Sequence, residues 1–138
     1  ATLVLPARFV VKRDLANALP TQGWNLYAVP VPGREPSAPP PAKLSVGVFE
    51  PKQPTRHSDT TLVFLCPNGV GYEQLAGFLS GYAEDLGVAR VVAFNFRGVG
   101  SSQGEPTRAA DLVDDATAVI NFAIDRLAAD PRHLVLHG

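Results

Sequence analysis

The stretch that decides the fold is "TLVFLCPNGVGYEQLAGFLSGYAEDLGVARVVAFNF", residues 61–96. It begins with an unbroken apolar run, "TLVFLC", which is typical of a strand buried on both faces of a parallel sheet. An amphipathic helix ending at Gly87 is predicted next, because large side chains follow at spacings of three and four at Tyr72, Leu75, Leu79, Tyr82 and Leu86. A second apolar run, "RVVAFNF", predicts another buried strand. The stretch is therefore predicted to be a strand, a helix and a strand.

The rest of the C-terminal half repeats this pattern. A second helix over residues 109–129 is predicted by an apolar face made of Leu112, Ala116, Val119, Ala123 and Leu127. We expect it to start near Thr107 and to stop at Asp130-Pro131, and "HLVLHG" (133–138) predicts a third apolar strand. Alternating strands and helices are typical of right-handed crossovers. Residues 60–138 are therefore predicted to form an α/β core with a mostly parallel sheet and flanking helices.

Residues 1–59 differ in composition from this core. The run "VPVPGREPSAPPPAK" (29–43) favours an exposed, polyproline-like connection, with a ligand for an SH3-type domain as the alternative. It separates two predicted strands, "WNLYAVPV" (24–31) and "LSVGVFEP" (44–51). In the second, Leu44, Val46 and Val48 alternate with small residues at the strand period. Both strands are expected at an antiparallel edge of the sheet.

Composition excludes several classes of function. The 138 residues are 46% hydrophobic, enough for one sizeable core, and the 12 basic and 13 acidic side chains leave no basic surface for nucleic acid. No apolar run approaches the roughly 20 residues that cross a bilayer, and we expect a soluble protein. The single Cys66 is expected to be a buried thiol, and the spacing of His57, His133 and His137 predicts no metal site.

Three turns follow the predicted parallel strands, and ligands bind α/β sheets at these carboxyl ends. They are "PNGVG" (67–71), "RGVGSSQG" (97–104) and the terminal "HG" (137–138). A plain interpretation of the first is a tight turn that needs a positive φ at Gly69 or Gly71. A phosphate-binding loop is not favoured, because no G-K-[ST] follows the glycines.

The segments "TLVFLCPNGVGYEQ", "VVAFNFRGVGSSQG", "DLVDDA" and "HLVLHG", in this order, resemble the N-terminal half of an α/β-hydrolase. The resemblance covers the chain from about Trp24 onward. In that family a strand runs directly into the nucleophile elbow, G-x-S-x-G, and Gly138 stands where the first Gly of the elbow belongs. The catalytic Ser, acid and His would follow residue 138. The absence of Met likewise indicates that Ala1 is not the translational start.

A narrower resemblance is carried by "NG" with the following "YEQ", together with "NFRGVGSS". These residues are similar to a group of uncharacterised bacterial hydrolase-like proteins first noted in Chlamydia. The resemblance leaves two locations open, a cytoplasmic protein and a secreted bacterial effector.

The family resemblance also implies roles for the first two turns. The family's first turn usually reads His-Gly-x, and the N–H of x helps to form the oxyanion hole. Here Asn68-Gly69-Val70 makes the Val70 amide the candidate donor, with Asn68 in place of the His. The next turn, D-x-R-G-x-G-x-S in the family, is matched by residues 95–102, and it implies structural roles for Arg97, Gly98, Gly100 and Ser102. The Arg would brace neighbouring loops and the Ser hydroxyl would satisfy turn amides.

The segment "GSSQG" (100–104) also fits G-x-S-x-G letter for letter. Ser102 would then be the nucleophile, with the acid and base drawn from Asp111, Asp114, Asp115, His133 and His137. Residues 97–99 nevertheless separate this motif from its strand, and Glu105-Pro106 stand where an elbow's helix should begin. The acids are expected on the solvated face of their helix, and His133 is expected to point into packing. Ser102 is therefore predicted to be part of the scaffold.

The reaction class that the resemblance implies is serine-dependent hydrolysis of an ester, thioester or amide in a small-molecule acyl substrate, without a cofactor. The chain alone is not expected to catalyse it, because the last strand leaves the sheet open. The expected partner is the C-terminal remainder of the same polypeptide. The alternative is a catalytically inactive hydrolase-like module that binds a partner or acts as an effector, and a continuation reading x-S-x-G would discriminate between the two.

Overall fold

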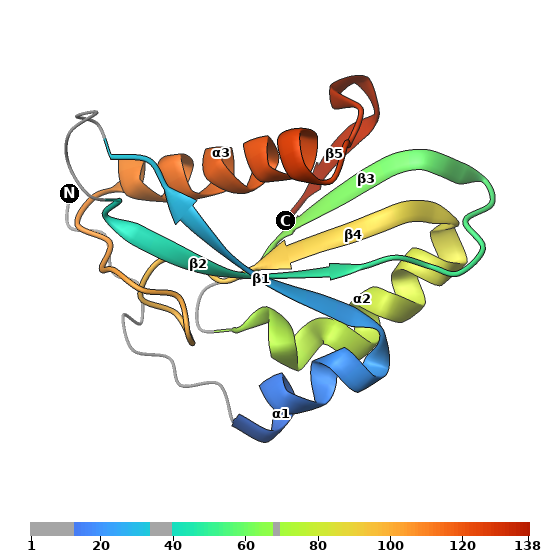
Figure 1. Ribbon diagram of the computed structural model, residues 1–138, viewed down its shortest axis with the longest axis horizontal. Coiled ribbons are helices and arrows are strands. Elements are labelled where there is room, and N and C mark those ends of the chain that lie inside the picture. The colour runs from blue at the N-terminus through green and yellow to red at the C-terminus, as the bar shows by residue number, and fades with distance from the viewer. Residues whose placement is uncertain (1–12, 34–39, 68–69) are drawn as a thin grey trace.

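The computed structural model describes residues 13–33, 40–67 and 70–138, and it places one sheet between two layers of helices (Figure 1). The strands are β1 (Trp24–Val31), β2 (Ala42–Phe49), β3 (His57–Leu65), β4 (Val88–Phe94) and β5 (Leu134–His137). The helices are α1 (Arg13–Ala18), α2 (Tyr72–Leu86) and α3 (Ala109–Arg126), with short 3₁₀ turns η1 (Leu19–Gln22) and η2 (Pro131–His133).

The sheet is mixed, with the strand order β1-β2-β4-β3-β5. β2 pairs antiparallel with both β1 and β4, whereas β3 pairs parallel with both β4 and β5. The antiparallel edge and the parallel core predicted from the sequence are therefore confirmed. Strands from before and after residue 59 join in this one sheet, and β3 itself begins at His57.

One face of the sheet is covered by α3 (Figure 1). The alternating residues of β2, Leu44, Val46 and Val48, are all buried in this layer. They share the cluster with Val119 and Phe122 of α3. The strand-period pattern of β2 thus faces the core as predicted.

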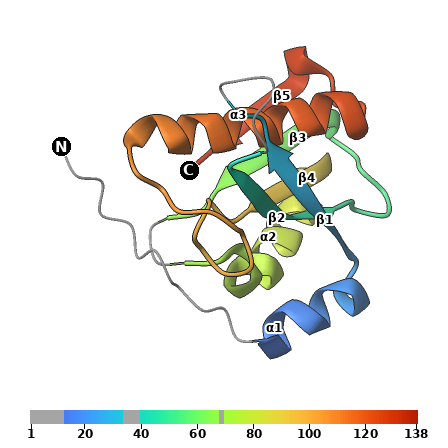
Figure 2. The same cartoon turned by 60° about the vertical axis from the view of Figure 1, so that its left-hand side comes forward.

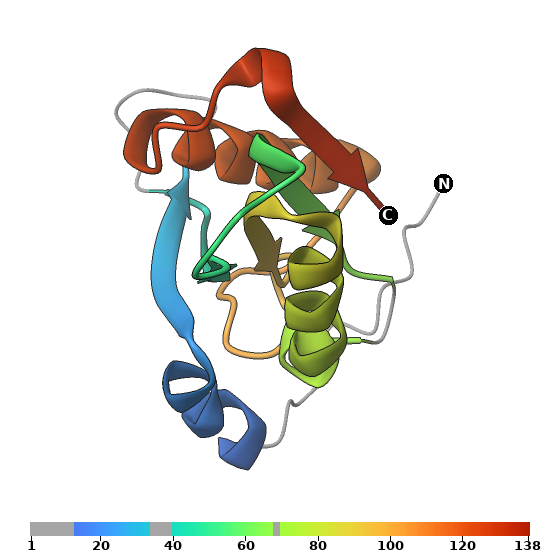
Figure 3. The same cartoon turned by 90° about the vertical axis from the view of Figure 1, so that its right-hand side faces the viewer.

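The other face carries α2 and α1, which lie on the same side of the sheet (Figures 2 and 3). Its cluster is centred on Trp24, whose ring centroid lies 5.6 Å from that of Phe49 and 6.1 Å from that of Tyr72. Leu19 from the η1 turn is buried in the same cluster. The segment before β1 therefore adds to the core, although no periodicity predicted its helical structure.

The second predicted helix ends three residues earlier than expected. The sequence favoured an end near Ala129, but α3 stops at Arg126. Ala128 has a φ of +58°, in the left-handed region, and the Ala129 N–H donates to the Ala123 carbonyl at 2.9 Å. The chain thus turns out of the helix before Asp130-Pro131 is reached.

Replacing Gly77 by alanine is expected to raise the free energy of unfolding by about 0.5–1 kcal/mol. Gly77 lies on the exposed side of α2, and a Cβ there meets no atom within 4 Å. Alanine therefore gains helix propensity without a clash. Urea unfolding of the two proteins measures the difference, and a loss of stability would contradict it.

Candidate functional site

The turn after β3 leads directly into α2. Asn68 and Gly69, two of the predicted site residues, lie outside the described residues. Val70 is half-buried, and its N–H donates to the Pro67 carbonyl at 3.3 Å. Gly71, which precedes α2, has a φ of −84°, so this position does not require a positive φ. The Val70 amide therefore stands between the carboxyl end of β3 and the first turn of α2.

Gly138 follows the neighbouring strand. Phe64 of β3 is in register with His137 of β5, so Gly138 comes level with Leu65. A Cβ at Gly138 would lie 3.7 Å from the Leu65 Cβ. The predicted elbow start and the predicted oxyanion turn are thus at the carboxyl ends of adjacent parallel strands.

The carboxyl end of β4 is organised by Asn95, which is fully buried. Its backbone N–H donates to the Ser45 carbonyl at 3.1 Å, and its carbonyl accepts from the Ser102 hydroxyl at 2.7 Å. Its side-chain Oδ1 accepts from the Tyr72 N–H at 2.9 Å, and Nδ2 donates to Glu73 Oε1 at 2.8 Å. Asn95 therefore connects β2, the turn after β4 and the start of α2.

Glu73 is a buried carboxyl group in the first turn of α2. Burial raises its pKa, while its own backbone N–H and the Asn95 amide act in the opposite direction. The Cys66 thiol is partly buried near this carboxyl, and desolvation, followed by the charge of Glu73, raises the pKa of Cys66 to about 12. Cys66 is therefore a protonated thiol near neutral pH, unsuited to nucleophilic attack.

Arg97 is held by two aspartates of α3. Its Nη2 lies 2.7 Å from Asp115 Oδ1, its backbone N–H donates to Asp115 Oδ2 at 2.9 Å, and its Nη1 lies 3.7 Å from Asp111 Oδ1. The prediction that these acids lie on a solvated face was wrong, since both are buried. Burial acts to lower the pKa of the Arg97 guanidinium, but Asp115 and Asp111 outweigh it and raise that pKa. Arg97 thus ties the turn after β4 to α3.

We expect Asp111 to make the protein sensitive to acid between about pH 4 and pH 2. The Thr107 N–H, the Thr107 hydroxyl and Arg97 lower the pKa of Asp111 from 3.8 to about 2, against desolvation by burial. Since the folded-state pKa is lowered, its stabilisation is present above pH 3.8 and disappears as the pH falls through about 2.

The matching variant is Asp111→Asn. At pH 7 its free energy of unfolding should be about 1–2 kcal/mol lower than that of the wild type. This is less than the full value from the pKa shift, because water near the carboxylate screens its charge. This gap should close as the pH falls to about 2. Urea titrations at several pH values measure it, with the exposed Asp125→Asn as control. A gap that is independent of pH would contradict the assignment.

The turn after β4 needs its glycines. Gly98 and Gly100 have φ values of +80° and +56°, where a side chain is strained. Between them, the Val99 N–H donates to the Phe96 carbonyl at 3.0 Å. Ser102 is buried at the end of the turn, and its hydroxyl also accepts from the Ser45 N–H at 2.8 Å. The hydroxyl thus satisfies one backbone donor and one backbone acceptor.

The structure does not bring Ser102 together with a histidine. His137 lies on β5, where its ring stacks on Phe64 with a centroid distance of 5.6 Å and meets Tyr82 edge-on. β3 separates β5 from β4, which puts about 10 Å between the strands that carry His137 and the Ser102 turn.

The expectation for His133 was wrong. It lies in the η2 turn before β5, not inside a strand, and its side chain is 44% exposed. Its ring nitrogens lie 3.3 Å from Asp59 and 3.2 Å from Asp130. These contacts are at the amino ends of β3 and β5, away from the candidate site.

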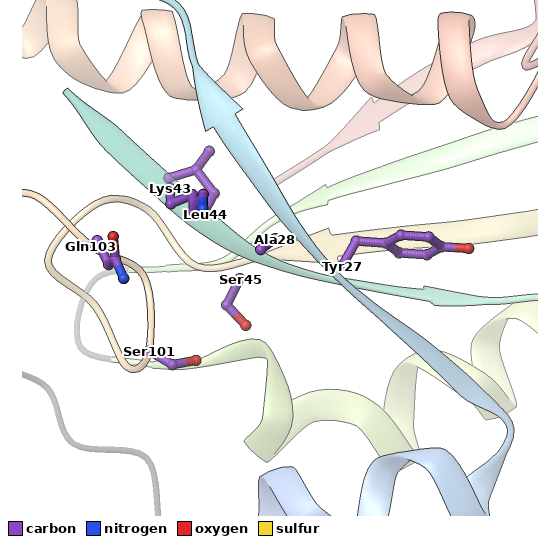
Figure 4. Close-up of a pocket in the computed structure, with 7 residues that line it drawn as sticks. All are labelled: Tyr27, Ala28, Lys43, Leu44, Ser45, Ser101 and Gln103. Atoms are coloured by element: carbon purple, nitrogen blue, oxygen red, sulfur yellow. The ribbon is translucent and has the colours of Figure 1, made fainter. Parts of the chain in front are cut away.

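A shallow hollow of about 230 Å³ lies at the antiparallel end of the sheet (Figure 4). Its lining comes from β1, β2 and the turn after β4, namely Tyr27, Ala28, Lys43, Leu44, Ser45, Ser101 and Gln103. It is smaller than the roughly 300 Å³ of ordinary ligand pockets. Since the strand order separates it from Gly138 and β5, it is not part of the candidate site.

Neither a metal-ligand cluster nor a membrane-spanning helix is found among the described residues. Within residues 13–33, 40–67 and 70–138, no three His, Cys, Asp or Glu side chains gather as metal ligands. Over the same ranges, no helix has both the length and the apolar character to span a bilayer.

The fold is similar to that of several solved structures. An α/β-hydrolase from Vibrio vulnificus is 20% identical with a TM-score of 0.70, over 96% of this chain and 42% of that one. A Pyrococcus furiosus esterase is 18% identical with a TM-score of 0.60, over 97% of this chain and 45% of that one. An α/β serine hydrolase homologue from Coxiella burnetii is 24% identical with a TM-score of 0.63, over 81% of this chain and 50% of that one.

The chain thus spans half or less of the length of these structures. No protein-family model and no curated protein sequence matches it. Because these identities are below 25%, the similarity establishes the fold alone. The chain therefore has the α/β-hydrolase fold, of which it supplies an incomplete part, with five strands among the described residues.

Proposed function

We propose that this chain is the N-terminal part of a serine hydrolase that cleaves an ester, thioester or amide bond. In this proposal Val70 donates its backbone N–H to the oxyanion, and Gly138 is the first residue of the nucleophile elbow. The nucleophile, acid and base come from the C-terminal remainder of the same polypeptide. The substrate is a small acyl compound.

One observation carries the proposal, the placement of Gly138 beside the turn that contains Val70. An α/β-hydrolase needs the residue after its nucleophile and the turn after β3 to supply amides to one oxyanion. Adjacent parallel strands lie about 4.8 Å apart, so turns at their carboxyl ends are close enough to contact the same carbonyl group. The Val70 N–H must exchange its Pro67 partner for the oxyanion, and at 3.3 Å that hydrogen bond is long.

The exposed edge of the sheet supports a C-terminal remainder. β5 is the last strand in the sheet of the described residues, and its Val135 and Leu136 are 47% and 51% exposed. Val135 is in register with Leu62 and Leu136 with Val63, so they lie on opposite faces of the sheet. A strand with apolar side chains exposed on both faces favours further pairing and further helices.

The test is labelling of the intact polypeptide with a fluorophosphonate probe. Such probes react with activated serine nucleophiles, and the labelled residue is located by peptide mass spectrometry. We expect one label, on a serine after residue 138. Absence of labelling in a folded protein would overturn the proposal and favour the inactive binding module.

Ser102→Ala gives a second prediction with the same probe. Because the Ser102 hydroxyl is committed to Ser45 and Asn95, its loss should cost about 1–3 kcal/mol of stability. Probe labelling should remain within about twofold of the wild type, since the hydroxyl has no catalytic role. Loss of labelling in a folded variant, or a label on Ser102 itself, would contradict this assignment.

A further inference from the structure

We infer that Asn95 and Glu73 form a positioning pair that fixes the Val70–Gly71 segment, and this inference rests on the proposed role of Val70. Neither residue is placed to touch the substrate. They act through the backbone of α2. The motifs at the strand ends do not include Glu73. They include Asn95 only as the first residue of the turn 95–102, with no role of its own.

The first step concerns the start of α2. The first N–H groups of a helix have no partner within the helix, and a side chain before the helix usually accepts from them. Gly71 holds that position and has no side chain. The Tyr72 N–H instead donates to Asn95 Oδ1, from a residue after β4. The helix start is therefore attached to the sheet by Asn95.

The second step concerns the rigidity of this attachment. The Asn95 backbone is itself fixed, because its N–H bonds to β2 and its carbonyl accepts from Ser102. Only one residue, Gly71, separates the Tyr72 nitrogen from Val70. A displacement of Tyr72 therefore moves the Val70 amide by a similar amount, and oxyanion stabilisation is sensitive to about 1 Å.

The third step concerns the orientation of the Asn95 amide. Its oxygen and nitrogen could exchange places by a half-turn, which would point the NH₂ group at the Tyr72 N–H. The Glu73 carboxylate only accepts hydrogen bonds, and it takes Nδ2 at 2.8 and 3.1 Å. It thereby selects the orientation in which Oδ1 faces Tyr72. Glu73 positions Asn95, and Asn95 positions the turn.

The pair can be tested by exchanging its donor and acceptor. Asn95→Asp removes the Nδ2 donor and places two carboxyl groups at hydrogen-bond distance, which repel each other when both are ionised. The double variant Asn95→Asp/Glu73→Gln restores one donor and one acceptor, and the second Asp oxygen can still accept from the Tyr72 N–H. Val119→Ala is the matched control, because it removes a buried side chain on the opposite face of the sheet.

Two measurements on the intact polypeptide follow the pair. Hydrogen exchange by mass spectrometry, over peptides covering residues 66–76, should accelerate at least about tenfold in Asn95→Asp. Hydrolysis of p-nitrophenyl acetate should lose about 10- to 100-fold in kcat with KM within about threefold. The double variant should recover most of both, and Val119→Ala should change neither by more than about twofold.

Several results would overturn the inference. Unchanged exchange in folded Asn95→Asp does so, as does faster exchange with intact kcat, or a double variant no better than the single one. If Asn95→Asp does not fold, Glu73→Ala serves in its place, with Glu73→Gln as the conservative rescue. A wild type that is neither labelled by the probe nor active defeats the proposed function, whereas the exchange data then still decide whether the pair holds the segment.

Discussion

Replacing Asp115 by alanine is expected to lower the free energy of unfolding by about 3–5 kcal/mol. The Arg97 guanidinium is only 6% exposed, and Asp115 accepts from its Nε, its Nη2 and its backbone N–H. Without Asp115, two contacts with Asp111 remain for this charge. They are Asp111 Oδ1, 3.7 Å from Nη1, and the Asp111 carbonyl oxygen, 3.3 Å from Nη2. Leaving a buried charge without its closest partner lowers the free energy of unfolding by more than the intact ion pair adds to it. Chemical unfolding followed by circular dichroism measures the loss.

Asp125→Ala is the control for this substitution. Asp125 lies on the same helix with an exposed side chain, and its loss should change stability by no more than about 0.5 kcal/mol. A second comparison uses Arg97→Met/Asp115→Leu, which removes both charges and should be less destabilised than Asp115→Ala. A double variant less stable than the single one would contradict the explanation by an unpaired charge.

Gly47→Ala is expected to lower the free energy of unfolding by about 2–3 kcal/mol, although alanine is the better residue for a regular strand. A Cβ at Gly47 would lie 2.5 Å from Tyr72 Cε2 and 3.0 Å from Trp24 Cε3. Both rings are buried, at 1% and 2% exposure, and neither can turn away without disturbing its neighbours. Thermal and urea unfolding should both record the loss.

Gly77→Ala is the natural counterpart, because it makes the same chemical change where there is space. The two variants should shift stability in opposite directions, which separates the clash from the general effect of replacing glycine. If Gly47→Ala proved neutral, Tyr72 and Trp24 would have to be less tightly packed than the structure has them.

The strands were predictable because their patterns are simple. The unbroken apolar run of β3 and the alternation in β2 need no knowledge of distant residues. The order of the elements then restricted the topology to parallel crossovers. Each of these signals is local, and each is confirmed by the sheet.

The buried face of α2 is predicted less well than the strands, because the predicted face consists of large side chains alone. In α2 the residues against the sheet include Ala76 and Ala83, whereas Leu75 and Tyr82 are only partly buried. Small residues allow the helix to approach the sheet closely, and the larger ones pack along its sides. Periodicity predicts a buried stripe, but its centre depends on the distance between the layers.

The buried polar contacts could not be predicted from local pattern. Glu73 and Asn95 are separated by 22 positions, and Arg97 and Asp115 by 18. The sequence offers one signal, a polar residue next to an apolar run, as in "AFNF" (93–96). That signal marks Asn95 as unusual, but only the crossing of α2 over β4 identifies Glu73 as its partner.

The position of Trp24 makes it an intrinsic fluorescence probe of the packing between the sheet and α2. It is the single Trp among these 138 residues, and it lies where β1, β2 and α2 meet. An indole in such an apolar setting emits at shorter wavelength than one in water. Loss of the packing around Trp24 should therefore shift the emission to the red, so that fluorescence reports on this cluster while circular dichroism reports on the helices.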